Sequence, residues 1–199
     1  MLFDVIRSSL CPFDKIENLI PNKGKILDVG CGHGIFCRLL IAKSSNRSVL
    51  GIDPSAHKIK IAQKKATGLE NLKFKKAYLK DIRGIKFDCI TIIDVLYLFS
   101  PTEKVEILSR VKNLLKPDGF LILVEVSSKP DFLYKLIKLE ETLMVQLLKY
   151  TYSDTRKLYF QPDNHFFKLL KKIGFKSIKS KIIQGLSPYP KHLLIQAFK

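Results

Sequence analysis

The sequence predicts an α/β fold of the doubly wound type, in which helices cover both faces of a mostly parallel sheet. Short apolar runs rich in β-branched residues alternate with segments of helical period. A glycine-rich turn, GCGHG at 30–34, directly follows the first of these runs. The 199 residues are 46% hydrophobic, which is enough for one full core, so we expect a single domain over 1–199.

The first half of the chain shows the alternation clearly. Residues 1–23 are expected to form an N-terminal helical cap. After this cap, apolar runs predict strands and helical spacing predicts helices, in the order strand 25–29, helix 35–42, strand 48–52, helix 55–65 and strand 71–77. Ser55 stands at the start of the second helix, where its hydroxyl can accept a bond from a free backbone N–H.

The middle of the chain repeats the pattern. Residues 87–93, FDCITII, are rich in β-branched side chains and predict a strand. Residues 102–115 predict a helix whose apolar stripe is made of Leu108, Val111, Leu114 and Leu115. The tetrapeptide KPDG at 116–119 predicts a turn, and FLILVEV at 120–126 predicts a fifth strand.

The next stretch changes character. No strand-like run occurs between 129 and 157, and apolar residues from 132 to 150 form one helical face. We therefore expect 129–165 to be a helical lid or insertion on the same domain, after the fifth strand.

The end of the sequence predicts a helix and a hairpin. Residues 166–173 have helical spacing and are followed by Gly174, a plausible C-cap. Two apolar runs, at 175–183 and 192–198, predict strands joined by the loop QGLSPYPK. This hairpin makes one late strand antiparallel to the others.

Composition limits the class of protein. No run approaches the roughly 18 apolar residues of a membrane span, and the N-terminus lacks the pattern of a signal peptide. The four cysteines show no CxxC pair, so we expect a reducing cytoplasm, no disulfides and no structural zinc site. The formal net charge of +17 fits either a compositional bias or an anionic partner.

The glycine turn points to a ligand. Gly30, Gly32 and Gly34 leave room for a ligand to approach the backbone, and open α/β sheets bind ligands at the carboxyl ends of their strands. Asp53 ends the second expected strand, where a carboxylate can accept hydrogen bonds from ribose hydroxyls. The dinucleotide fingerprint GxGxxG has its third glycine where this chain has Ile35, so the pattern departs from that of a nicotinamide oxidoreductase.

Four segments resemble class I methyltransferases that use S-adenosylmethionine: ILDVGCGHG, GIDPS, FDCITIIDVLYLF and LLKPDGFLILVEV. The resemblance covers 24–126 in order and with ordinary spacing. It implies a seven-stranded sheet with an antiparallel last strand, a cofactor-binding core over 24–128, and a final helix and hairpin over 166–199. It also implies S-adenosylmethionine as the cofactor and S-adenosylhomocysteine as the product.

The resemblance further implies roles for single residues. Asp28 would help to hold the amino acid end of the cofactor, directly or through water, and Asp53 would bind the ribose hydroxyls. Asp94 would reach toward the methionine end, although a strand-end acid can also cap the next helix. The remaining expected cofactor-binding residues are Gly30, Cys31, Gly32, Gly34, Pro54, Leu79 and Val95. Cys31 and Cys37 also fit a role as small packing residues.

One position departs from the family pattern. Many relatives end the third strand with Gly-Asp, whose aspartate contacts the adenine amino group, whereas this chain has Ala77-Tyr78. The backbone at Leu79 would contact the ring instead, and Tyr78 would either stack on it or face away. Asp81 matches a different position of the family.

The catalytic residues are not assigned. Methyl transfer from a sulfonium requires mainly alignment and exclusion of water, with a base only where the acceptor must lose a proton, and no metal is required. Tyr97 and His165 are the candidates for the substrate pocket. The alternative for Tyr97 is packing in the core, and the alternative for His165 is a capping role at the start of a helix. His33 is expected to be a local cap or packing residue.

The acceptor is the least determined feature. We expect a small molecule, hydrophobic or lipid-like, because 129–165 carries a broad apolar face with lysines beside it. That face fits a lid over the pocket, a contact between two copies of the chain, or a peripheral membrane contact. The protein would accordingly be a monomer or a homodimer. The alternatives are an RNA acceptor attracted by the positive charge and a non-catalytic scaffold or sensor that binds the cofactor.

Overall fold

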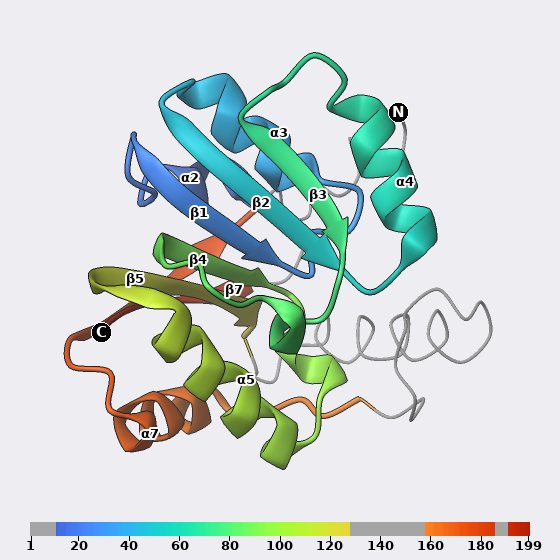
Figure 1. Ribbon diagram of the computed structural model, residues 1–199. Helices are drawn as coiled ribbons and strands as arrows, with labels where there is room; N and C mark the ends of the chain where they lie inside the picture. The colour runs from blue at the N-terminus through green and yellow to red at the C-terminus, as the bar shows by residue number, and fades with distance from the viewer. Residues whose placement is uncertain (1–10, 128–157, 186–190) are drawn as a thin grey trace.

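The computed structural model describes residues 11–127, 158–185 and 191–199, and in these ranges the chain forms one seven-stranded sheet flanked by helices (Figure 1). The strand order is β3-β2-β1-β4-β5-β7-β6. The strands are β1 (Gly24–Val29), β2 (Arg47–Asp53), β3 (Leu72–Lys76), β4 (Phe87–Ile93), β5 (Leu115–Val126), β6 (Ile178–Gln184) and β7 (Lys191–Phe198).

The sheet confirms the doubly wound topology expected from the sequence. Strands β1 to β5 pair in parallel, and β7 runs antiparallel to both of its neighbours, β5 and β6. The chain builds outward from β1 to β3, then returns to place β4 on the other side of β1. The strand order therefore reverses between β1 and β4, which is where this class of fold forms its ligand crevice.

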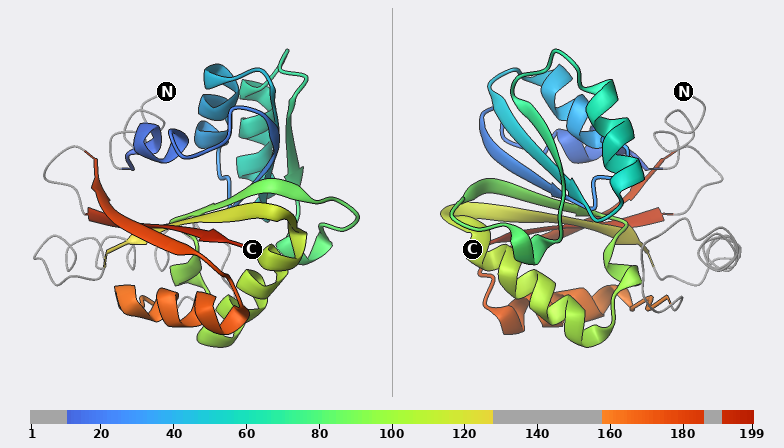
Figure 2. Two further views of the ribbon diagram at one scale, coloured as in Figure 1. Left: turned by 90° about the vertical axis from the view of Figure 1, so that its left-hand side faces the viewer. Right: turned by 45° about the vertical axis from the view of Figure 1, so that its right-hand side comes forward.

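Two helical layers cover the two faces of the sheet (Figure 2). One layer contains α2 (Phe13–Glu17), α3 (Ile35–Lys43) and α4 (Ala56–Lys65), and the other contains α5 (Pro101–Leu114) and α7 (Asp163–Ile173). Two short 3-10 helices follow strand ends, η1 (Leu79–Asp81) and η2 (Leu96–Leu98).

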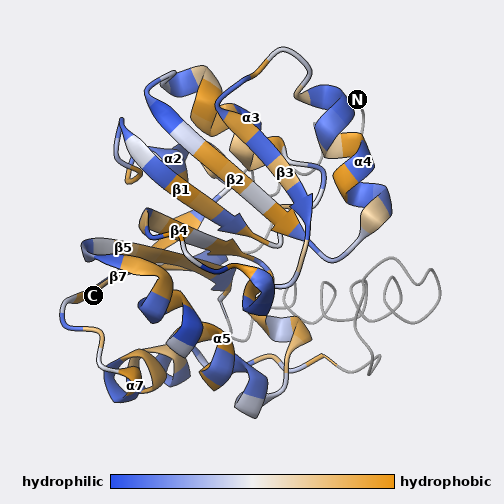
Figure 3. Ribbon diagram, in the orientation of Figure 1, coloured by the Kyte–Doolittle hydropathy of each residue, from blue (hydrophilic) through white to orange (hydrophobic). Residues whose placement is uncertain are grey.

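The core consists of two clusters, one on each face of the sheet. Neighbouring strand residues belong to opposite clusters, as Ile26 and Leu27 in β1 and Ile122 and Leu123 in β5 do. This is the two-residue alternation of side chains along a strand. Because both faces are buried, the central strands are continuously apolar, whereas the helices carry polar residues on their outer sides (Figure 3).

Capping residues lie at three helix boundaries, and two of them, Ser55 and Gly174, are the caps that the sequence predicts. The Ser55 hydroxyl accepts from the Lys58 N–H (3.4 Å) at the start of α4. Ser100 and Glu103 form a reciprocal capping box at the start of α5. Gly174 ends α7 in the left-handed region, with φ at 90°.

The turn predicted at 116–119 lies inside a strand. β5 begins at Leu115, opposite Phe87, and its register with β4 shifts so that Phe120 lies opposite Cys89. The four residues of KPDG therefore bulge out of the ladder without ending it. Gly119 fits here because a Cβ at this position would lie 2.9 Å from the Phe87 carbonyl oxygen.

Two predicted bounds in the last third were wrong. α7 begins at Asp163 rather than 166 and follows Pro162, whose fixed φ suits a helix entry. β6 begins at Ile178 rather than 175, because the Phe175 N–H is used by the end of α7, where it donates to the Leu170 carbonyl (3.1 Å).

Several expectations fall outside the described residues. The helical face at 132–150, most of the expected lid at 129–165, and most of the hairpin loop belong to 128–157 and 186–190. In the ranges that the structure describes, no helix combines the length and the apolar character needed to cross a membrane.

Candidate functional site

The expected ligand-binding residues gather at the carboxyl ends of β1, β2 and β4. β1 lies between β2 and β4 and pairs in parallel with both. Gly30 and Cys31 follow β1, and their N–H groups both donate to the Ile52 carbonyl at the end of β2 (2.8 and 3.0 Å). Two neighbouring strand ends are thereby joined beside the point where the strand order reverses.

The glycine turn has a conformation that other residues rarely adopt. Gly30, Gly32 and Gly34 all lie in the left-handed region, with φ of 75°, 54° and 71°. A Cβ on Gly30 would lie 2.5 Å from a Val95 methyl carbon, and one on Gly34 would lie 2.3 Å from the Phe74 ring. A Cβ on Gly32 would meet nothing within 4 Å. The turn is thus packed at both ends and open in the middle, which fits a cradle for a ligand.

Asp53 holds the middle of this turn. Its carboxylate is buried and accepts from the Gly32 N–H (3.1 Å) through Oδ2 and from the Ser55 N–H (2.8 Å) through Oδ1. These two bonds fix the orientation of the carboxylate before any ligand arrives. Each oxygen keeps a second lone pair that can accept from a hydroxyl, so Asp53 fits the predicted ribose contact.

Asp28 lies beneath the turn and is 3% exposed. Its carboxylate accepts from the Thr91 hydroxyl (2.6 Å) and from the Cys37 thiol (3.2 Å). Burial is the main cause that raises the pKa of Asp28 from 3.8 to about 6, with a smaller contribution from the charge of Asp53. Burial also raises the pKa of the Cys37 thiol well above its usual value, so this cysteine is a packing and hydrogen-bonding residue.

Asp94 and Val95 turn the chain at the end of β4. Among the described residues Asp94 is the one non-glycine residue with positive φ, at 53°, a conformation that aspartate tolerates better than most residues. The next two backbone N–H groups, of Val95 and Leu96, donate to one oxygen of Glu125 (3.2 and 2.8 Å). Val95 faces Gly30, so this turn and the glycine turn are in contact.

Glu125 is a buried site residue that sequence reasoning missed. Burial, followed by the charge of Asp94, raises its pKa to about 8. The Lys104 charge opposes this rise, and the Lys104 side chain itself is buried and donates to the Tyr159 carbonyl. The acidic residue in the strand FLILVEV was the available signal, because a charge inside an apolar run has to be paired or neutralised.

Tyr97 is buried and stacks on Phe160, with ring centroids 5.2 Å apart and an angle of 8° between the planes. The Tyr97 carbonyl accepts from the Tyr159 N–H (2.7 Å), which joins η2 to the segment before α7. His165 lies half-buried in the first turn of α7, and burial lowers its pKa. The structure thus brings Tyr97 to the segment that leads to His165 and places the histidine edge-on against Phe166.

The expected adenine contacts lie at the ends of β2 and β3. Pro54 follows Asp53 and is partly exposed, and Leu79 begins η1 with its side chain in the core. The Tyr78 side chain is 48% exposed and carries the Lys80 ammonium 5.4 Å from its ring centre. Asp81 is engaged locally, accepting from the Tyr78 N–H (2.9 Å). The His33 backbone carbonyl accepts from the Arg38 side chain (2.8 Å), and the expected role of the His33 imidazole stays a prediction.

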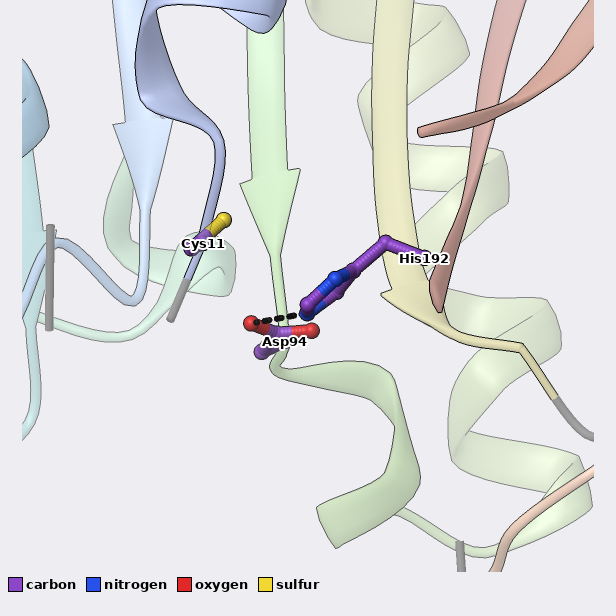
Figure 4. A group of neighbouring side chains, drawn as sticks. All are labelled: Cys11, Asp94 and His192. Atoms are coloured by element: carbon purple, nitrogen blue, oxygen red, sulfur yellow. Dashed lines mark ion pairs between the residues drawn. The ribbon is translucent and has the colours of Figure 1, made fainter. Parts of the chain in front are cut away.

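A second group near the end of β4 was also missed by sequence reasoning. Cys11, Asp94 and His192 converge from the segment before α2, from the end of β4 and from β7 (Figure 4). His192 Nε2 lies 3.4 Å from Asp94 Oδ2. No spacing rule links these residues, because they are far apart in sequence; the signal available was a histidine in the apolar strand HLLIQAF.

Comparison with known sequences identifies the family. The family model described as a methyltransferase domain matches residues 20–171. The protein YqeM of Bacillus subtilis, named as a methyltransferase, is 32% identical over 122 residues, which cover 57% of this chain and 49% of YqeM. A ubiquinone biosynthesis O-methyltransferase of Actinobacillus pleuropneumoniae is 33% identical over 106 residues, covering 49% of this chain and 43% of that enzyme. The chain spans about half the length of the curated relatives it matches.

Comparison with solved structures gives the same fold. The magnesium protoporphyrin IX methyltransferase of Synechocystis, solved with bound S-adenosylhomocysteine, has a TM-score of 0.73 at 22% identity and covers 98% of this chain and 86% of its own. The family match spans most of the chain, and the seven-stranded sheet with its antiparallel last strand agrees with it. The chain therefore belongs to the family of class I S-adenosylmethionine-dependent methyltransferases.

Proposed function

We propose that the protein transfers a methyl group from S-adenosylmethionine to a small acceptor of hydrophobic or lipid-like character. The observation that carries the first part is the glycine turn, open at Gly32 and held by the Asp53 carboxylate, in a chain of the methyltransferase family. This arrangement suits a ligand that has a ribose and needs close approach to the backbone.

The residues present fit the cofactor in named roles. Asp53 would accept from the ribose hydroxyls, with Pro54 beside the adenine and the Leu79 backbone at its edge. Asp28 would act on the amino acid end through the lone pairs that Thr91 and Cys37 leave available. Bound S-adenosylmethionine supplies an activated methyl group on a sulfonium.

The chain's contribution to the chemistry is alignment. The contact between Gly30 and Val95 fixes the glycine turn against the turn after β4, and Glu125 holds the Val95 and Leu96 N–H groups in place. Rigid placement of this kind lowers the barrier by bringing the acceptor atom into line, without a covalent step by the protein. No general base is assigned.

The nature of the acceptor is supported by the aromatic pair of Tyr97 and Phe160. Both rings lie where the segment before α7 meets η2, so the pair suits one wall of an apolar acceptor pocket. A relative named for ubiquinone biosynthesis and a structural neighbour named for magnesium protoporphyrin IX support a small-molecule acceptor. A lid, a homodimer contact and a peripheral membrane contact at 129–165 stay predictions.

Calorimetry with S-adenosylhomocysteine tests the cofactor assignment. The full chain is expected to bind, and Asp53→Ala is expected to weaken binding by about 10- to 100-fold, because a hydrogen bond to a charged group contributes roughly 1.5–3 kcal/mol. Asp118→Ala removes an exposed carboxylate in the bulge of β5 and serves as the matched control. A folded chain that fails to bind, or an Asp53→Ala variant that binds as tightly as the parent, would overturn the assignment.

A transfer assay tests the acceptor class. With isotopically labelled methyl donor and a cell extract, label is expected in the fraction that organic solvent extracts. Label confined to RNA, with RNA binding that falls steeply with salt, would replace this acceptor by the RNA alternative. No label in any fraction, together with intact cofactor binding, would favour the non-catalytic scaffold.

A further inference from the structure

The group formed by Cys11, Asp94 and His192 has the composition of a metal site. All three side chains are buried, and one ligand atom from each lies within 4.8 Å of the other two. They come from three separate segments, so the fold itself brings them together (Figure 4). A thiol, an imidazole and a carboxylate are the three kinds of side chain that bind zinc.

The separation of two of the ligands matches a tetrahedral ion better than a direct hydrogen bond. His192 Nε2 and Asp94 Oδ2 are 3.4 Å apart, whereas N–H···O bonds have roughly 2.7–3.2 Å between the heavy atoms. Two ligands that each lie about 2.0–2.2 Å from one tetrahedral ion are about 3.3–3.6 Å from each other. The two side chains therefore already span one edge of a tetrahedron.

The surroundings of His192 also lack a complete set of polar partners. The ring is almost fully buried in the sheet, and its Nδ1 atom has no hydrogen-bond partner among the described residues. Buried polar atoms are nearly always paired, so an ordinary packing role leaves this imidazole poorly satisfied. The unpaired atom is Nδ1, whereas Nε2 is the nitrogen that faces Asp94. An ion bound through Nε2 would therefore engage the thiol, the carboxylate and the ring, but it would not supply a partner for Nδ1.

We propose that Cys11, Asp94 and His192 bind a divalent transition metal of the zinc class. The soft thiolate and the imidazole favour zinc over magnesium or calcium, which prefer oxygen ligands. A divalent cation also offsets the negative charge that Asp94 and Glu125 place close together. Three protein ligands leave the fourth tetrahedral position to water or another donor atom.

Cobalt substitution tests the site without any assay of methyl transfer, so the result is separate from that of the proposed function. The full chain is stripped with a chelator, dialysed and titrated with Co²⁺ under reducing conditions. Binding at this site is expected to give visible bands of tetrahedral Co²⁺ and a near-ultraviolet thiolate-to-cobalt charge-transfer band. Zn²⁺ is expected to displace Co²⁺ and remove both.

Matched variants assign the ligands. Cys11→Ser is expected to abolish the charge-transfer band, and His192→Gln to weaken Co²⁺ binding at least about tenfold. Cys89→Ser, another buried cysteine, and His57→Gln, an exposed histidine, are the controls and should bind as the parent does. Circular dichroism verifies that each variant is folded.

Two results would overturn the proposal. One is a folded parent chain that shows no tetrahedral cobalt spectrum at any Co²⁺ concentration that keeps it soluble. The other is a spectrum that survives unchanged in folded Cys11→Ser and His192→Gln, which would place the ion elsewhere. If Cys11→Ser or His192→Gln does not fold, Asp94→Asn takes its place. This variant keeps the shape of the site and is expected to weaken Co²⁺ binding in the same assay.

Discussion

At the scale of single residues, the site is built from carboxylates whose surroundings differ. Asp53 is oriented by two backbone N–H groups, whereas Asp28 is bonded to side chains inside the core. The first arrangement stabilises a charged acceptor for a ligand, and the second leaves a charge in a place where burial disfavours it. At neutral pH the buried charge of Asp28 therefore lowers the stability of the folded protein.

Replacing Asp28 by asparagine is expected to stabilise the protein at neutral pH. The folded state binds the Asp28 proton more tightly than the unfolded state, because its pKa is raised from 3.8 to about 6. Stability from this group is therefore fully present below about pH 4 and is lost as the pH rises to about 6, with a total change of about 3 kcal/mol. Urea denaturation measured between pH 4 and 7.5 should show that the free energy of unfolding of the variant, relative to that of the parent, increases as the pH rises.

The control for this change is Asp118→Asn, which alters an exposed carboxylate. Parallel pH profiles of the parent and Asp28→Asn would contradict the raised pKa. If Asp28 also holds the amino acid end of the cofactor, the same variant should bind S-adenosylhomocysteine more weakly while it unfolds at higher urea.

At the scale of elements, a buried arginine attaches α2 to the sheet. Arg47, in the first position of β2, is 1% exposed and pairs with Glu17 of α2 at 2.6 Å. Its guanidinium also donates to the carbonyls of Pro21, Ile20 and Leu40. This fork of donors joins α2, the loop after it and α3 at one point.

Arg47→Met is expected to lower the free energy of unfolding by about 3–5 kcal/mol, because Glu17 would stay buried without its partner. The double variant Arg47→Met with Glu17→Met removes both charges and should recover part of that loss. Urea midpoints of the three proteins measure the difference. A single variant as stable as the parent would show that the buried pair is not what holds α2 in place.

The elements also show which parts of the fold the sequence can predict. The strand at 87–93 was predicted with its exact ends, because an apolar run rich in β-branched residues is a local signal. Strands β1, β2, β3 and β7 were predicted to within one residue at each end. The bulge at 116–119 was predicted as a turn, since the peptide has turn chemistry but its place in the ladder depends on β4. The roles of Arg47, Glu125 and His192 were not predicted, because their partners are distant in sequence.

At the scale of the whole molecule, the sheet has its last strand in its interior. β7 lies between β5 and β6 and supplies Leu193, Ile195 and Ala197 to one core cluster. It also carries Leu194 into the cluster on the other face. Both layers of the molecule therefore depend on a strand that comes late in the chain.

A chain lacking 191–199 is expected to lose cooperative unfolding and to aggregate. Removal of β7 leaves β5 as an unpaired edge with apolar faces, a template for pairing between molecules, and it leaves β6 without its strand partner. A denaturation curve and light scattering measure the two effects, and a truncated chain that stays monomeric with a sharp transition would contradict the expectation. Changing the exposed residues Lys179 and Lys181 to glutamine in the full chain is the control for altered solubility alone.

The interior position of β7 also sets an order of events for a chain emerging from the ribosome. The glycine turn and its partners on β1, β2 and β4 can be synthesised long before β7 exists, yet His192 arrives only with β7. Before β7 is synthesised, the nascent chain can therefore form only an incomplete sheet, in which one edge of β5 lacks its antiparallel neighbour. Arrival of β7 therefore closes both core clusters and brings the imidazole to Asp94 in the same late step.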